Sequence, residues 1–143
     1  MSKLHDVLMR QFENMGKAYE EYARANGLTY LSLSMLEAIY EAGDSCTQKR
    51  ISEETHYPKQ MVNLVIKSFL ESGCVELREI PSDHRNKQII LTSKGRQLCE
   101  RVVAPMLEAE DRAARGLSEH QSELLAALLE LYGESYCEEL KRI

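Results

Sequence analysis

The side chains best suited to chemistry lie on one face of the segment between Pro58 and Gly73. At 100° per residue, Gln60, Asn63 and Lys67 share an arc of about 60°. Glutamine and asparagine can pair with adenine edges, and lysine can pair with guanine or phosphate. The apolar residues of the segment gather on the opposite side, and they are Val62, Val65, Ile66, Phe69 and Leu70. We expect one face to pack against a core and the other to offer hydrogen-bonding groups.

A second polar group, Asp83 and Arg85, lies between two short segments rich in β-branched and aliphatic residues, 75–80 and 88–92. The residues between them, 81–87, have the composition of a loop. The sequence therefore predicts a β-hairpin with a charged tip. Such a tip can carry an arginine into the minor groove of a duplex or along its backbone.

The charge of the chain is unevenly distributed. The formal net charge is −5, yet residues 47–96 hold nine Lys or Arg against six Asp or Glu, so the flanks carry −8. Because fields fade within about 8 Å at physiological salt, a basic centre between acidic flanks allows a local phosphate-binding surface. The alternative interpretation is an ordinary solvated surface.

Apolar spacing and capping residues define the elements that must position these groups. Thr29 or Ser32, Thr47, and Thr92 or Ser93 are the expected N-caps, and Ser118 opens a capping box. We expect helices over 4–26, from Tyr30 or Leu33 to Glu41, from Gln48 to about Thr55, from Pro58 to about Ser72, from Ser93 to Gly116 with a kink at Pro105, and from Ser118 to the C-terminus.

This order of elements predicts a mainly α fold with a small β-hairpin wing. A short helix, a tight turn, a helix with a polar outer face and a charged hairpin are typical of a winged helix-turn-helix. We assign residues 29–96 to a winged helix-turn-helix DNA-binding domain, and 1–28 with 97–143 to a helical dimerisation region. No apolar run is long enough to span a membrane and the first ten residues are charged, which favours a cytoplasmic protein.

The helices 4–26 and 122–143 have apolar faces that are too broad for a small three-helix core to cover. Exposed patches of that size normally mark an interface, so we expect a homodimer. The alternative is that the two helices pack on each other within one chain. The expected interface residues are Leu4, Leu8, Phe12, Leu124, Leu128 and Tyr132.

Several motifs together resemble the MarR family of bacterial transcriptional regulators. Residues 47–52 look like its first helix-turn-helix segment, and residues 58–75 look like its recognition helix, closing with Gly73. Asp83 and Arg85, placed before the Leu-Thr-x-x-Gly motif of residues 91–95, resemble its wing signature. Leu117, Ser118 and Glu119 at the start of a leucine-rich last helix are also similar, so the resemblance covers nearly the whole chain.

The resemblance implies an obligate homodimer that binds double-stranded DNA at a pseudo-palindromic operator, in most relatives as a repressor. Arg85 would enter the minor groove, with Asp83 orienting it through a charge-assisted bond. Asn63 and Tyr57 depart from the residues common in relatives, and the departure at Asn63 leaves the operator sequence open. The expected DNA-binding residues are Gln48, Lys49, Lys59, Gln60, Asn63, Lys67, Asp83, Arg85 and Lys87.

Tyr30 and Tyr40 are the candidate ligand-binding residues, because relatives bind phenolic effectors at the junction of their two regions. A small aromatic or phenolic effector is therefore a candidate partner, and two core tyrosines are the alternative. Leu64, on the polar face of the recognition helix, either touches a thymine methyl or tucks under the wing.

The cysteines leave a thiol-based redox sensor as an alternative function. Cys46, Cys74, Cys99 and Cys137 form no CxxC pair, and small core residues are the alternative interpretation for Cys74 and Cys99. Peroxide-sensing relatives carry a reactive cysteine in the first helix, whereas the first 45 residues here contain none.

Enzyme and metal chemistry find no support in the motifs. The four histidines, His5, His56, His84 and His120, have no zinc-ligand spacing, so no metal and no cofactor is expected. No GxSxG, P-loop or paired His and Cys motif favours a hydrolase or thiol enzyme. A winged-helix module that contacts proteins without binding DNA is the second alternative function.

Overall fold

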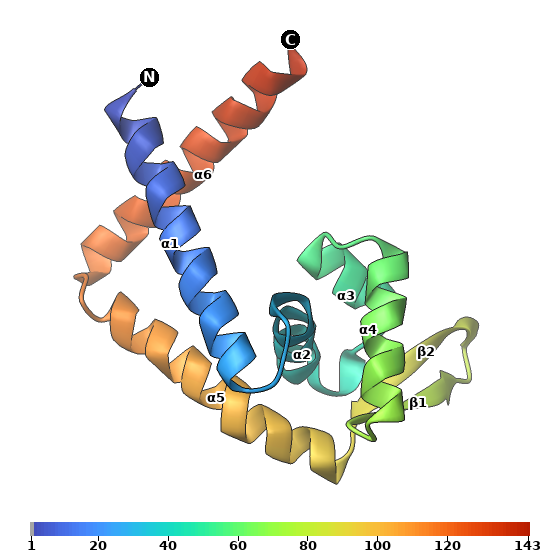
Figure 1. Cartoon of the computed structure of the whole chain (residues 1–143). Coiled ribbons are helices and arrows are strands. Elements are labelled where there is room, and N and C mark those ends of the chain that lie inside the picture. The colour runs from blue at the N-terminus through green and yellow to red at the C-terminus, as the bar shows by residue number, and fades with distance from the viewer. Residues whose placement is uncertain (1) are drawn as a thin grey trace. The chain divides into compact units, whose positions relative to one another are not determined.

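The computed structural model describes residues 2–143, which form helices and one β-hairpin (Figure 1). The chain divides into two units, of which the first ends at Ala104 and the second comprises Pro105–Ile143. The prediction of a mainly α fold with a hairpin is confirmed. In chain order the elements are α1 (Lys3–Ala25), α2 (Tyr30–Ala42), the 3₁₀ helix η1 (Gly43–Ser45), α3 (Gln48–Thr55), α4 (Lys59–Glu71), β1 (Val75–Ile80), β2 (Asp83–Leu91), α5 (Ser93–Ala114) and α6 (Glu119–Lys141).

The helix starts follow from the capping residues. The hydroxyl oxygen of Thr29 accepts a bond from the Ser32 amide at 3.0 Å, and that of Thr47 accepts from the Arg50 amide at 3.1 Å. At the start of α6 the capping box is complete, because the Ser118 amide donates to the Gln121 side chain and the Gln121 amide donates to the Ser118 hydroxyl. Each cap satisfies an amide that the helix itself leaves unpaired.

One apolar core joins α2, α3, α4, the hairpin and the first part of α5. The buried face of α4 is confirmed for Val62, Val65, Ile66 and Phe69, while Leu70 is only half-buried. Leu33, Met35, Leu36 and Ile39 come from α2, and Ile51, Val75, Ile89, Cys99, Val102 and Val103 come from the other elements. Because α4 and the hairpin share this core, their exposed faces are fixed relative to each other.

The hairpin differs from the sequence prediction at its second strand. We expected the strand to begin at Gln88, but β2 already begins at Asp83, and only Pro81 and Ser82 form the turn. Ile80 pairs with Asp83 and Glu79 pairs with Lys87, so three residues of β2 lie at a bulge opposite no residue of β1. The prediction failed because it used side-chain composition, whereas strand pairing is made by the backbone and accepts charged residues at an exposed tip.

Two glycines are required where α4 passes into the hairpin and the hairpin into α5. Gly73 ends α4 with φ 74°, and the Cys74 amide reaches back to the Phe69 carbonyl at 2.9 Å, which is a Schellman closure. A Cβ added to Gly95 would lie 1.9 Å from the Cys74 carbonyl oxygen. The start of α5 therefore rests directly on the backbone between α4 and β1.

No helix formed by residues 2–143 combines the length and the apolar composition that crossing a bilayer requires.

We predict that Gly95→Ala lowers the free energy of unfolding by about 1–3 kcal/mol, because the methyl group would overlap a backbone carbonyl that cannot rotate away. Urea unfolding followed by circular dichroism measures the change. Gly16→Ala is the matched control, since a Cβ at Gly16 in α1 meets nothing within 4 Å and alanine favours a helix. Equal midpoints for Gly95→Ala and the wild-type protein would contradict the close contact.

Candidate nucleic-acid interface

The outer face of α4 is polar and exposed, as the sequence predicted. Gln60, Asn63 and Lys67 are all exposed to solvent. Leu64 lies on the same face and its exposed fraction is 72%, so the alternative that it tucks under the wing is wrong. Figure 1 shows α4 beside α3, with the hairpin next to it.

A cavity of about 440 Å³ opens where α3, the start of α4 and the hairpin meet. It is lined by Gln48, Lys49, Lys59, Arg85 and Asn86. Three of the five are cations, so the cavity concentrates positive charge on an otherwise acidic chain. The structure thus brings four of the predicted DNA-binding residues to one place, from three different elements.

The remaining predicted residues lie around this cavity and not in its lining. Gln60, Asn63 and Lys67 belong to the outer face of α4, and Lys87 is exposed on β2 opposite Glu79. An acid and a base placed across the strands favour the pairing of the hairpin. Lys87 therefore faces an acidic residue across the strands, in addition to any role toward phosphate.

Asp83 holds the wing tip through backbone and amide donors. Its carboxylate accepts a bond from the Arg85 backbone amide at 3.0 Å and one from the Asn86 side-chain amide at 2.7 Å. The bond to Asn86 is the main reason why the pKa of Asp83 lies below its ordinary value, and the bond to the Arg85 amide adds to it. The expected charge-assisted bond to Arg85 thus reaches its backbone, which leaves the guanidinium exposed.

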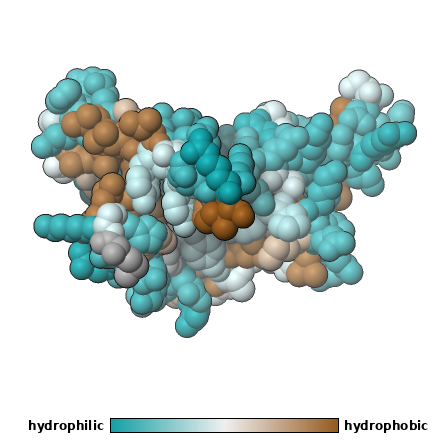
Figure 2. All heavy atoms as spheres, turned by 90° about the horizontal axis from the view of Figure 1, so that it is seen from above, coloured by the Kyte–Doolittle hydropathy of each residue, from teal (hydrophilic) through white to brown (hydrophobic). Residues whose placement is uncertain are grey.

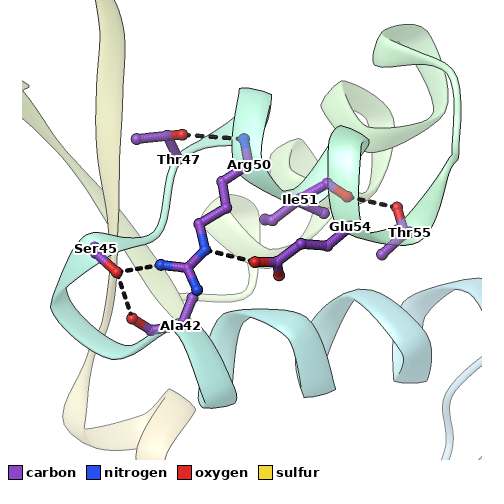
Figure 3. Close-up of polar contacts among 7 residues, drawn as sticks. All are labelled: Ala42, Ser45, Thr47, Arg50, Ile51, Glu54 and Thr55. Atoms are coloured by element: carbon purple, nitrogen blue, oxygen red, sulfur yellow. Dashed lines mark hydrogen bonds and ion pairs between the residues drawn. The ribbon is translucent and has the colours of Figure 1, made fainter.

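Arg50 positions α3, a role that the sequence analysis missed (Figure 3). Its Nε donates to the Glu54 carboxylate at 2.6 Å, and its guanidinium also donates to the Ser45 hydroxyl in η1. Ser45 in turn donates to the Ala42 carbonyl at the end of α2. The charge of Arg50 is thus neutralised within the fold, and the i,i+4 spacing of Arg50 and Glu54 was the signal that could have revealed it.

The wing is attached to the segment that precedes α3. The Ile89 amide donates to the Cys46 carbonyl at 2.8 Å, Thr47 forms a bridge with Gln88, and the Gln88 side chain donates to the Asp44 carbonyl. Thr47 is also the cap of α3, so the base of the wing and the start of α3 are held by the same residues. The lining of the cavity is therefore one connected framework.

The two candidate ligand tyrosines are not brought together. Tyr30, in the first turn of α2, lies against Tyr19 with ring centroids 4.6 Å apart. Tyr40, near the other end of α2, lines a separate cavity of about 260 Å³ with Asp44, Ile90, Leu91, Arg96 and Glu100 among its walls. Tyr40 therefore borders an open cavity, whereas Tyr30 packs against another aromatic ring.

The cysteines differ in exposure. Cys46, Cys74 and Cys99 are buried, Cys137 is exposed, and none forms a disulfide. Burial raises the pKa of Cys46 to about 11 and that of Cys99 to about 12 from an ordinary value of 9.0. Since the thiolate is the reactive form, these two side chains behave as small core residues. Among residues 2–143 no three His, Cys, Asp or Glu side chains gather into a metal-binding group.

Large apolar side chains remain exposed on α1 and α6. On α1, Leu4 and Phe12 are more than half exposed and Leu8 is half-buried. On α6, Leu124 and Leu128 are about half exposed, and Tyr132 stacks on Tyr136 with centroids 6.2 Å apart. Figure 2 shows such apolar groups, in brown, interrupting the teal polar surface. Each of the two helices therefore presents apolar surface that the described chain does not fully cover.

Comparison with known proteins agrees with this fold. Residues 26–86 match the model of the MarR family. The MarR family regulator NMB1585 from Neisseria meningitidis has a TM-score of 0.78 at 23% identity over 99% of both chains. MepR of S. aureus in complex with DNA has a TM-score of 0.75 at 20% identity, over 95% of this chain and 99% of MepR.

A third solved structure is BpsR of Bordetella bronchiseptica, described with the regulation of its DNA binding by 6-hydroxynicotinic acid. It has a TM-score of 0.70 at 20% identity, over 92% of this chain and 99% of BpsR. No curated protein gives a significant match. At these identities the likeness concerns the fold, and it confirms the predicted winged helix-turn-helix of MarR type.

We predict that Cys46 and Cys99 resist alkylation by iodoacetamide at pH 8 in the folded protein and react at once in denaturant. Their raised pKa values keep both thiols neutral at pH 8 in the folded protein. The stability that comes from burying the neutral thiols is complete below pH 9. It is lost as the pH rises toward 11 to 12, because the thiols of the unfolded chain ionise first. Mass spectrometry of the labelled peptides measures the rate at each site. Rapid labelling of Cys46 or Cys99 at pH 8 without unfolding would contradict the burial and would favour a thiol sensor at that residue.

Proposed function

Because residues 26–86 match the model of the MarR family and the chain has the fold of solved MarR family regulators, we propose that this protein binds double-stranded DNA sequence-specifically as a homodimeric transcriptional regulator. The observation that carries the proposal is the cavity lined by Lys49, Lys59 and Arg85 beside the exposed polar face of α4. A duplex offers phosphates and base edges, and both kinds of group have partners on this surface.

In this proposal α4 enters the major groove. Gln60 and Asn63 pair with base edges, and Lys67 binds guanine or phosphate. Lys49, Lys59 and Gln48 hold the phosphate backbone that passes the cavity, and Lys87 adds a further phosphate contact from the wing. Asp83 keeps the tip in shape, so that the free guanidinium of Arg85 reaches the minor groove.

The homodimer proposal rests on the apolar surface of α1 and α6. Residues 1–28 and 97–143 form the dimerisation region, with Leu4, Leu8, Phe12, Leu124, Leu128 and Tyr132 in the interface, and residues 29–96 form the DNA-binding domain. Two-fold symmetry then places two copies of α4 on the half-sites of a pseudo-palindromic operator. Repression follows where such an operator overlaps a promoter, and the protein acts in the cytoplasm.

A small aromatic ligand is the proposed signal for release. The cavity beside Tyr40 offers an aromatic ring, apolar walls from Ile90 and Leu91, and the charged Arg96 and Glu100. BpsR is a structural neighbour whose DNA binding is regulated by an aromatic acid. A ligand in this cavity would release DNA only by binding one separation of the two α4 helices better than another.

A winged-helix module that contacts proteins is the competing function, and it makes no use of the cationic cavity.

We predict that Arg85→Ala weakens binding of a selected operator by about 1–3 kcal/mol and reduces the preference for narrow, A·T-rich minor groove. Lys49→Ala should weaken all sequences alike and lower the slope of log affinity against log salt by about 1.

Fluorescence anisotropy with labelled duplexes from several rounds of selection on random DNA measures both effects over a range of salt. Lys141→Ala, a change of an exposed lysine on α6, is the control for the loss of a positive charge away from the cavity. If both cationic variants bound like wild type, the groove assignments would be wrong, and if wild type bound no duplex in dilute salt, the competing function would take its place.

We also predict that the chain sediments at twice its monomer mass at micromolar concentration. Leu128→Asp should shift it toward the monomer, because a carboxylate would be buried in the apolar interface. Leu64→Asp is the matched control, since it makes the same change to an exposed leucine on α4 and should stay dimeric. A wild-type monomer in analytical ultracentrifugation would remove the homodimer.

A further inference from the structure

Leu64 is exposed to an extent that folding does not explain. At 72% it is the most exposed large apolar side chain within residues 2–143 apart from Ile143 at the C-terminus. The next most exposed, Met15 and Leu131 at 66%, lie on α1 and α6, where the proposed dimer would cover apolar surface. No such cover is proposed for α4.

The position of Leu64 on the helix accounts for this exposure. At 100° per residue it points about 150° away from the mean direction of the buried residues Val62, Val65, Ile66 and Phe69. Because it faces away from the core, the side chain adds nothing to the stability of the packed domain. Whatever uses this leucine must approach the outer face of α4.

The neighbours of Leu64 indicate what approaches. Gln60 lies four residues before it and Lys67 three residues after it, so both flank it on the same face, and Asn63 is adjacent. Met61, also three residues away, is 44% exposed. Within residues 2–143, Met61 and Leu64 are the two large apolar side chains of α4 that are exposed. An apolar group this small, surrounded by hydrogen-bonding side chains, is too narrow for a stable protein interface.

The edge of a thymine has the matching pattern. In the major groove thymine presents a 5-methyl group next to an oxygen acceptor, and its adenine partner presents a donor and an acceptor. An apolar side chain between a glutamine, an asparagine and a lysine can meet the methyl while its neighbours meet the polar groups.

We infer that Leu64 is a specificity-determining residue that recognises the 5-methyl group of a thymine in each half-site, with Met61 beside it. The inference rests on the proposed function and goes beyond it, because it assigns a base and an atom to one side chain. The placement along α4 agrees with it, because a recognition helix contacts bases with its N-terminal part. The acidic Glu71, on the same face, lies about 10 Å farther along the axis, which keeps its carboxylate away from the base.

The experiment replaces single thymines of the selected operator by deoxyuridine, which differs only in lacking the methyl group. For wild type we expect one or two thymines per half-site at which deoxyuridine lowers affinity about fourfold, the effect of uncovering one buried methyl group. Leu64→Ala should bind the thymine operator about as weakly as wild type binds the deoxyuridine operator. It should show no further loss when the methyl group is also absent.

Asn63→Ala is the matched control on the same helix face. It removes a hydrogen-bonding side chain, so it should weaken binding while keeping the fourfold ratio between thymine and deoxyuridine. Since Leu64 is exposed, the Leu64→Ala variant should unfold at the wild-type urea midpoint, which separates reading of the methyl from damage to the fold.

The outcomes are distinct. A ratio near one at every thymine for wild type, or selected half-sites without thymine, overturns the inference while leaving DNA binding in place. An equal ratio for wild type and Leu64→Ala also overturns it, because another group would then sense the methyl. Failure of wild type to bind any duplex defeats the proposed function itself.

Discussion

The orientation of the candidate DNA-binding groups depends on one apolar core shared by short elements. Helix α4 has 13 residues, α3 has 8, and the sheet has two strands, and elements of this size are marginal in isolation. Their common core around Ile51, Ile66 and Ile89 is fully buried. The outer face of α4 therefore acquires a fixed direction toward the hairpin only when the whole domain is folded.

The sequence was informative where a physical rule is local. The spacing of apolar residues and the capping residue predicted the observed bounds of α3, and the positions of Val62 and Ile66 predicted the buried face of α4. The sequence was uninformative where backbone hydrogen bonding decides the structure, because the types of the side chains do not reveal the pairing of Asp83 with Ile80. The proximity of Lys59 to Arg85 was equally invisible, since it arises from the packing of elements distant in the chain.

Charge counting illustrates the same difference. The basic excess of residues 47–96 allowed either a phosphate-binding surface or an ordinary solvated one, and one of its cations, Arg50, is paired with Glu54 and with Ser45 at the end of η1. The cations that line the cavity remain available, among them Lys49, which lies 3.9 Å from Glu53 on an exposed surface. Exposed pairs of this kind are weak and exchange readily for a stronger partner. Local geometry, and not the net charge, thus decides which basic residues can meet a phosphate.

The bulge at the end of the hairpin makes the length of the wing tip independent of the side-chain alternation in the paired part of the wing. Ile89 must face the core, and shifting the paired part of β2 by one residue would turn it to solvent. The residues 84–86 at the bulge have no partner on β1, so their number is not tied to that alternation. Relatives could therefore lengthen or shorten the tip by a residue, and so alter how far a cation extends along a duplex, without disturbing the inside of the domain.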